Sequence, residues 1–166
     1  MYRTIEDFKN EWKYEHESTL KIFRALTDNS LTQKITPDTR SLGYLAWHII
    51  LTLGEMGAKA GLPIHAPAEH ALMPNSASKI AEVYDKAGQS LVTEVANKWN
   101  DASLPEIIEM YGENWTRAQT LSALLKHQIH HRAQMTVLMR QAGLKVPGIY
   151  GPSKEEWIQY GMTPHE

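Results

Sequence analysis

LLKHQIHHRAQM, residues 124–135, forms the centre of a helix predicted over 116–142, because Leu and Met recur there at the spacing of one helix face. On this helix His127 and His131 are one turn apart, about 6 Å along the axis, so both imidazoles can reach one metal ion. At 100° per residue, His131 falls about 40° from the centre of the apolar arc, His127 about 80° and His130 about 140°. We therefore expect His131 to point inward, His127 to lie at the edge of the arc, and His130 to face solvent.

A second predicted helix supplies a candidate for a third ligand. Residues 41–54 read SLGYLAWHIILTLG and contain no charged side chain, so this helix should be buried on nearly all sides. His48 lies at the margin of its strongest apolar stripe. A buried imidazole needs a partner, since an unsatisfied polar group costs about 1–3 kcal/mol, and a hydrogen bond to a carbonyl would serve as well as a metal. Because a protein-bound divalent metal usually takes at least three protein ligands, we interpret His48 as the third.

Several segments together resemble a known family. They are LAWHI (45–49), WTR (115–117), HQIHHRAQ (127–134), LMRQAG (138–143) and VPGIYGP (146–152). In this combination the chain resembles the DinB/YfiT-like family of bacterial metal-binding proteins. The resemblance implies an all-α fold, an up-down four-helix bundle of the DinB/YfiT-like type with a short C-terminal helix. It also implies that His48, His127 and His131 bind one divalent metal.

The boundaries along the chain agree with a helical bundle. Helices are predicted over 4–26, 41–60 and 116–142, and another begins at Ser76 or Ser78, with Gly88 weakening its middle. Ser153 with Glu156 is expected to cap a short final helix. Residues 100–114 carry no pattern that we can assign, and no alternating strand pattern is present. We expect one DinB-like domain over residues 1–166.

Composition limits the partners and the compartment. The formal net charge of −2 gives no reason to expect nucleic acid. The N-terminus lacks the apolar region of a signal peptide, and no stretch reaches the roughly 18 apolar residues of a membrane span, so we expect a cytoplasmic protein without a membrane partner. The chain contains no Cys. Any thiol chemistry must therefore use a thiol from a small-molecule cosubstrate.

Four further residues are candidates for supporting the metal or contacting substrate. Thr52 and Glu55 follow His48 on the same helical face. Arg132 could bind a carboxylate, although we favour a side chain that lies along the bundle with its head in water. Tyr150 could close over the bundle end near the metal, although an aromatic in such a loop is usually a packing anchor. The remaining histidines lack a partner at ligand spacing and are interpreted as surface residues. They are His16, His65, His70 and His165.

The chemistry follows from three neutral imidazoles around one ion. Three protein ligands leave a coordination position open, and the metal keeps its double charge, so a bound water or thiol becomes a nucleophile near neutral pH. Imidazole suits Zn or Ni equally. The resemblance implies a metal-dependent small-molecule enzyme, a thiol S-transferase-like protein that uses a low-molecular-weight thiol as cosubstrate. A metal-dependent hydrolase and a non-catalytic, stress-induced metal or small-ligand binding protein are the alternatives. The resemblance also implies a homodimer.

Overall fold

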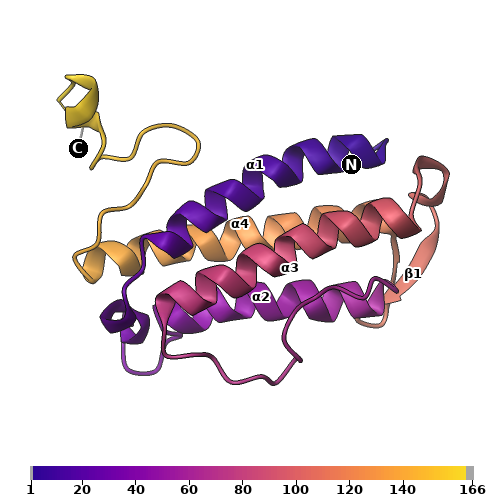
Figure 1. The fold of residues 1–166 in the computed structure, drawn as a ribbon, viewed down its shortest axis with the longest axis horizontal. Helices are drawn as coiled ribbons and strands as arrows, with labels where there is room; N and C mark the ends of the chain where they lie inside the picture. Colours follow the sequence, from indigo (N-terminus) through magenta and orange to yellow (C-terminus); the bar gives the residue numbers. More distant parts are fainter. Residues whose placement is uncertain (1, 164–166) are drawn as a thin grey trace.

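The computed structural model describes residues 2–163, in which four long helices pack side by side as a bundle (Figure 1). The prediction of an all-α four-helix bundle is confirmed. The helices are α1 (Ile5–Arg24), α2 (Leu42–Lys59), α3 (Ala77–Lys98) and α4 (Arg117–Gln141). The smaller elements are three 3-10 helices, η1 (Asp28–Thr32), η2 (Asp101–Ser103) and η3 (Trp157–Tyr160), and two strands, β1 (Ile107–Met110) and β2 (Glu113–Thr116).

The long helices begin where their capping residues predict. Thr4 and Thr116 each close a capping box, with Asp7 and Gln119 respectively, and so satisfy backbone N–H groups that the first turn leaves free. Ser41 caps α2, and Ser76 rather than Ser78 caps α3. Local side-chain chemistry thus marks the residue at which each long helix starts.

The alternation of helix direction is broken once, between α2 and α3. Residues 60–76 run back along the outside of the bundle, so α2 and α3 point the same way and α1 and α4 point the opposite way (Figure 1). The Ala77 N–H donates to Asp28 Oδ1 over 2.7 Å. This contact holds the start of α3 beside η1, the short helix that precedes α2 in the chain. In this arrangement α2 lies antiparallel against α4, and this contact brings His48 opposite the histidine pair.

Helix α2 is the most apolar of the four, as its sequence predicts. Its side chains at Leu42, Ile49, Ile50 and Leu53 are at most 1% exposed. Full burial of a side chain of this size stabilises the fold by roughly 1.5–3 kcal/mol. The helix that carries His48 is therefore held rigidly by its packing on both sides of that residue.

The prediction that His16 lies on the surface is wrong. Its ring packs between Trp12 and Tyr84, with ring centroids 6.1 Å and 5.1 Å away, and its Nε2 lies 3.4 Å from the Asp85 carboxylate. A Cβ on Gly88 would stand 2.3 Å from the His16 ring. Gly88 lowers the helix propensity of α3, but the absence of a side chain leaves the space that the imidazole occupies. This explains a glycine in the middle of the helix.

The other histidines assigned to the surface give a simpler result. His65 and His70 are exposed on the connection between α2 and α3, as predicted. His165 lies outside the described residues.

The hairpin of β1 and β2 was not expected from the sequence. The two strands pair antiparallel through four residue pairs, from Ile107 with Thr116 to Met110 with Glu113. Tyr111 and Gly112 form the turn with positive φ angles of 56° and 81°. Glycine favours this conformation, but tyrosine adopts it rarely, so only half of the turn signature is present in the sequence. Strands of four residues are also too short to show a clear alternation.

The short C-terminal helix is present, but it is a single 3-10 turn without a side-chain cap. It is the four-residue 3-10 helix η3, its N-cap is Glu156, and no side chain caps it, so the predicted Ser153 cap is wrong. Glu156 instead accepts hydrogen bonds from the backbone N–H groups of Gly148 and Ser153. The carboxylate thus closes the preceding loop on itself.

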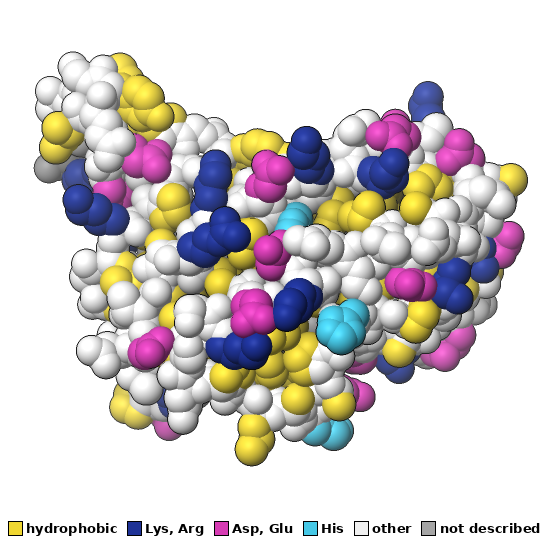
Figure 2. Space-filling model, viewed as in Figure 1, with side chains coloured by type: hydrophobic (Ala, Val, Ile, Leu, Met, Phe, Trp, Pro, Cys, Tyr) yellow, Lys and Arg dark blue, Asp and Glu magenta, His cyan; other side chains and the backbone are white. Residues whose placement is uncertain are grey.

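The surface mixes charges of both signs. On the face shown in Figure 2, acidic and basic side chains are interspersed, and the C-terminal segment projects from one end of the bundle. Within the described residues, no helix combines the length and apolar character that crossing a membrane requires.

Candidate metal centre

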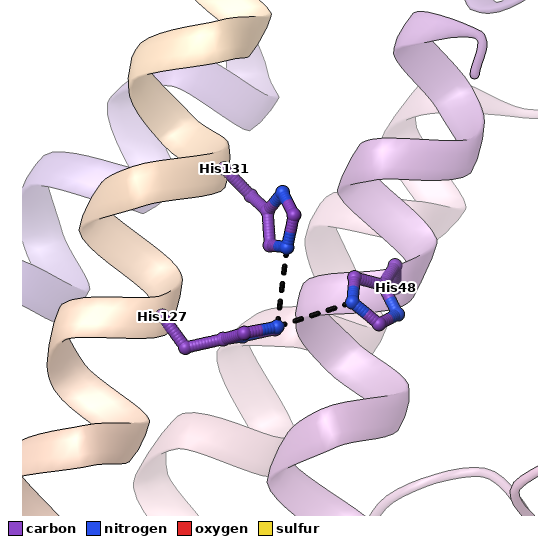
Figure 3. Close-up of side chains that lie close together, drawn as sticks. All are labelled: His48, His127 and His131. Atoms are coloured by element: carbon purple, nitrogen blue, oxygen red, sulfur yellow. Dashed lines mark hydrogen bonds between the residues drawn. The ribbon is translucent and has the colours of Figure 1, made fainter. Parts of the chain in front are cut away.

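Three imidazoles converge between α2 and α4 (Figure 3). His48 comes from α2, and His127 and His131 come from α4 one turn apart. The Nε2 atom of His127 lies 3.1 Å from Nε2 of His48 and 3.1 Å from Nε2 of His131. The structure therefore brings together the three histidines that the sequence singled out as ligands.

Hydrogen bonds among the three rings cannot satisfy this arrangement. A ring nitrogen carries either one proton or one lone pair, so Nε2 of His127 can donate once or accept once, but it has two nitrogen neighbours at 3.1 Å. The Nδ1 atom of His131 lies 2.8 Å from the Gln134 side-chain oxygen and donates to it, which leaves the lone pair of His131 on Nε2. A cation between the three lone pairs would satisfy all of them at once.

The distances fit a metal of the imidazole-binding class. Metal–nitrogen bonds of about 2.0–2.1 Å imply nitrogen–nitrogen separations of roughly 2.8–3.4 Å, the lower end for neighbouring octahedral ligands and the upper end for tetrahedral ones. The two observed separations of 3.1 Å fall in this range. All three ligand atoms lie within 4.8 Å of one another. Zn or Ni would suit this donor set.

Gln134 supports the trio and was missed by the sequence analysis. Its oxygen accepts from His131 Nδ1, and its Nε2 donates to His130 Nε2 over 3.1 Å. With the amide oxygen toward His131, the proton of this imidazole lies on Nδ1 and its Nε2 is free to bind a metal. The position of Gln134, one turn after His131 on the same helix, was the available signal.

Two more residues near the trio were also missed. The Tyr44 ring stacks on the His48 ring with centroids 5.9 Å apart and planes 15° apart. The Arg40 guanidinium in turn lies 5.0 Å from the centroid of the Tyr44 ring. Tyr44 is one turn before His48, so helical phase could have identified it, whereas Arg40 precedes the helix and follows no periodic pattern.

Comparison with known proteins agrees with this geometry. The model of the DinB family matches residues 1–163. The chain belongs to the DinB family. It is 43% identical over 162 residues to the uncharacterized protein YrdA of Bacillus subtilis, covering 98% of this chain and 97% of YrdA.

Two solved structures of DinB-like proteins have the same fold. The protein from Bacillus cereus has 43% sequence identity and a TM-score of 0.87, over 90% of this chain and all of that one. The DinB-like protein YjoA of Bacillus subtilis has 17% identity and a TM-score of 0.66, over 86% of this chain and 96% of that one, and at this identity it supports the fold alone. Family membership and the three adjacent histidines together fit a metal-binding DinB-like protein.

Of the other residues singled out in this DinB chain, Thr52 and Glu55 make their hydrogen bonds to groups other than the His48 ring. The Thr52 hydroxyl donates to the His48 backbone carbonyl over 2.9 Å. Glu55 lies two turns farther along α2, about 10 Å from His48 along the axis. There burial and then the Glu55 carboxylate, which accepts a hydrogen bond from Tyr111, raise the pKa of Tyr111 to about 12. Glu55 therefore supports the hairpin turn.

Arg132 is buried, so the interpretation that its head lies in water is wrong. Its guanidinium faces α1, where Nη1 lies 2.7 Å from Glu15 Oε2 and donates to Thr19 Oγ1. Its Nη2 donates to the Tyr150 hydroxyl over 3.0 Å, and that hydroxyl donates to Glu15 Oε1 over 2.6 Å. Tyr150 is thereby anchored against α1 and α4, away from the face that α4 turns toward His48.

Burial and mutual proximity keep the three imidazoles neutral. Burial, followed by the charges of His131 and His48, lowers the pKa of His127 to about 4. Burial first, and then neighbouring positive charges that include Arg40, also lower the pKa values of His48 and His131. Neutral imidazole is the form that binds metal, so these shifts prepare the site for a cation.

We expect zinc affinity to remain nearly constant from pH 8 to about pH 6 and to fall at lower pH. Protons compete with the metal only when the pH approaches the pKa of a ligand imidazole in the folded protein. For His127 this pKa is about 4. An exposed histidine site would begin to lose affinity near the ordinary pKa of about 6.5. A competition titration with a chromophoric chelator calibrated at each pH would measure this. Affinity that already declines above pH 7 would contradict the prediction.

Proposed function

We propose that this DinB protein is a metal-dependent thiol S-transferase that acts on small molecules, with His48, His127 and His131 as ligands of one divalent metal. The observation that carries the proposal is the convergence of three imidazoles, in which Nε2 of His127 lies 3.1 Å from Nε2 of His48 and 3.1 Å from Nε2 of His131. Three protein ligands leave at least one position for a further group, as in catalytic rather than structural sites.

The protein would hold the metal through the three imidazoles and keep those rings in a fixed orientation. A divalent metal with only neutral ligands keeps its charge, lowers the pKa of a bound thiol, and so makes a nucleophile available at neutral pH. The chain has no Cys, so the sulfur must come from a low-molecular-weight thiol. That sulfur would form a bond to an electrophilic carbon of the substrate, the leaving group would depart with its electron pair, and the thiol proton would pass to solvent. Gln134 would keep the His131 ring in position throughout.

The test compares turnover with and without metal. Untagged protein, loaded with Zn or with Ni, would be mixed with monochlorobimane and one of L-cysteine, glutathione or coenzyme A. We expect thioether formation that disappears in the metal-free protein and in the His48→Ala variant. Metal binding without turnover of any pair would favour a non-catalytic binding protein. Metal-dependent hydrolysis of 4-nitrophenyl acetate without a thiol would favour a hydrolase.

We further propose a cytoplasmic homodimer with no nucleic-acid or membrane partner. The family resemblance supports the dimer, and the net charge of −2 argues against a polyanionic partner. Light scattering at micromolar concentration measures the assembly, and a monomer there would contradict the proposed dimer.

A further inference from the structure

A cavity of about 520 Å³ lies beside the metal centre. Small-molecule sites usually measure about 300–1,000 Å³, so this cavity can take an organic molecule of moderate size. His131 and Gln134 form part of its wall, together with residues of the segment before α2 and of the second half of α4. A molecule in this cavity would therefore lie against one of the candidate metal ligands.

The cavity has an unpaired cation at its rim. Arg40 lines it and is exposed, and within residues 2–163 its guanidinium makes no hydrogen bond or ion pair. The guanidinium stacks over the ring of Tyr44, which in turn stacks on His48. The stack holds the guanidinium near the histidines and leaves its fork of N–H donors free. Such a fork matches a carboxylate or phosphate through two parallel hydrogen bonds.

The other lining residues indicate a ligand with one negative charge and an apolar body. A divalent metal with three neutral ligands adds two positive charges next to Arg40, and the carboxylate among the lining residues is that of Asp38. The walls also include the apolar side chains of Ile35, Leu45 and Val137. Ile35 and Val137 are 60% and 49% exposed, so a ligand could cover them. Arg40 and the metal would supply three positive charges, and Asp38 and a thiolate on the metal would supply two negative ones, so one carboxylate balances the site and a dianionic phosphate would exceed that balance.

We propose that this cavity is the substrate subsite of the metal centre and that Arg40 binds the carboxylate of an organic acid. The apolar part of the acid would lie against Ile35 and Val137, and its other end would reach the position beside His131. The inference rests on the proposed function for the identity of that reacting end. It adds the class of molecule that the site selects, an organic carboxylate, and the residue that selects it.

The experiment measures binding rather than turnover. Protein loaded with Co(II), which accepts the same imidazole ligands, would be titrated with 6-mercaptohexanoate and with the corresponding uncharged amide. A near-ultraviolet sulfur-to-cobalt absorption reports each thiol that binds. We expect the acid to bind about tenfold or more tightly than the amide, as a charge-assisted pair allows. Arg40→Gln should remove this preference and leave the affinity for the amide unchanged.

Arg24→Gln provides the matched control. Arg24 is an exposed arginine of α1 that does not line this cavity, so its loss changes the net charge equally and should leave the preference for the acid intact. Equal binding of acid and amide by the unaltered protein would overturn the inference. So would an equal loss of both ligands in Arg40→Gln, or much tighter binding of 6-mercaptohexyl phosphate than of the acid.

A second measurement separates this inference from the proposed function. If no thiol gave the cobalt absorption, the thiol chemistry would be wrong, whatever Arg40 does. Calorimetry on metal-free protein with hexanoate and hexanamide would then decide about Arg40 alone. Hexanoate binding that exceeds hexanamide binding and is lost in Arg40→Gln supports the carboxylate subsite, and indifference to charge overturns it.

Discussion

Replacing His127 with alanine should abolish metal binding, from about one ion per chain in the unaltered protein to less than about a tenth. Nε2 of His127 lies 3.1 Å from each of the other two candidate ligand atoms, so its removal leaves two ligands where a stable site needs at least three. Even residues that only orient a ligand change metal affinity about 10–100-fold, so the loss of a ligand should exceed 100-fold. Mass spectrometry for metals on untagged protein measures the content directly.

His130→Ala is the matched control for this prediction. His130 is a neighbour of the pair on the same helix, but it is exposed, and it meets the site through the Gln134 amide and through an edge contact of its ring with the His131 ring, not as one of the three converging nitrogens. We expect this variant to keep about one metal ion per chain and to lose less than about tenfold in affinity. Circular dichroism would show that both variants remain helical. Retention of metal by a folded His127→Ala protein would remove His127 from the ligand set.

The disposition of the histidines on α4 follows from helix geometry alone. The 100° step predicted that His131 faces inward, His127 lies at the edge and His130 faces solvent, and in the structure they are buried, half-buried and exposed respectively. That prediction succeeded because the apolar arc of one helix contains the information. The apolar character of α2 predicted only that His48 needs a partner, and the requirement of a metal site for at least three protein ligands indicated that this partner is shared with the histidine pair.

Features that depend on distant partners could not be read in the same way. Arg132 looks like a surface residue in the sequence, but Glu15 reaches it from α1, 117 positions earlier, and makes burial of both charges feasible. The sequence near Arg132 and near Glu15 contains no pattern that predicts this ion pair. The direction of α3 has a similar cause, because the long connection 60–76 allows the chain to return along the bundle before the helix starts. Arg40 lies outside any helix, so periodicity gave it no role.

Replacing Arg132 with methionine should destabilise the fold by about 3–5 kcal/mol, the usual cost of removing one partner from a buried ion pair. Arg132 and Glu15 are each 3% exposed, and Arg132 Nη1 lies 2.7 Å from Glu15 Oε2. Methionine fills much of the volume, but it leaves the Glu15 carboxylate buried, and among residues 2–163 its remaining hydrogen-bond donor is the Tyr150 hydroxyl. In a chain of this size the loss should lower the melting temperature by roughly 10 °C. Urea unfolding followed by circular dichroism measures the free energy.

The double variant Arg132→Met with Glu15→Leu should recover most of the lost stability, because replacing both charges with apolar groups of similar volume removes the unpaired carboxylate. Metal content should stay at the value of the unaltered protein in the single and the double variant, since Arg132 faces α1 while the histidines face α2. This combination separates a structural ion pair from a substrate-binding arginine. If Arg132→Met left the stability unchanged, or if the double variant were as unstable as the single one, the buried carboxylate would not be the source of the cost, and the contact between α1 and α4 would depend on the apolar packing around the pair.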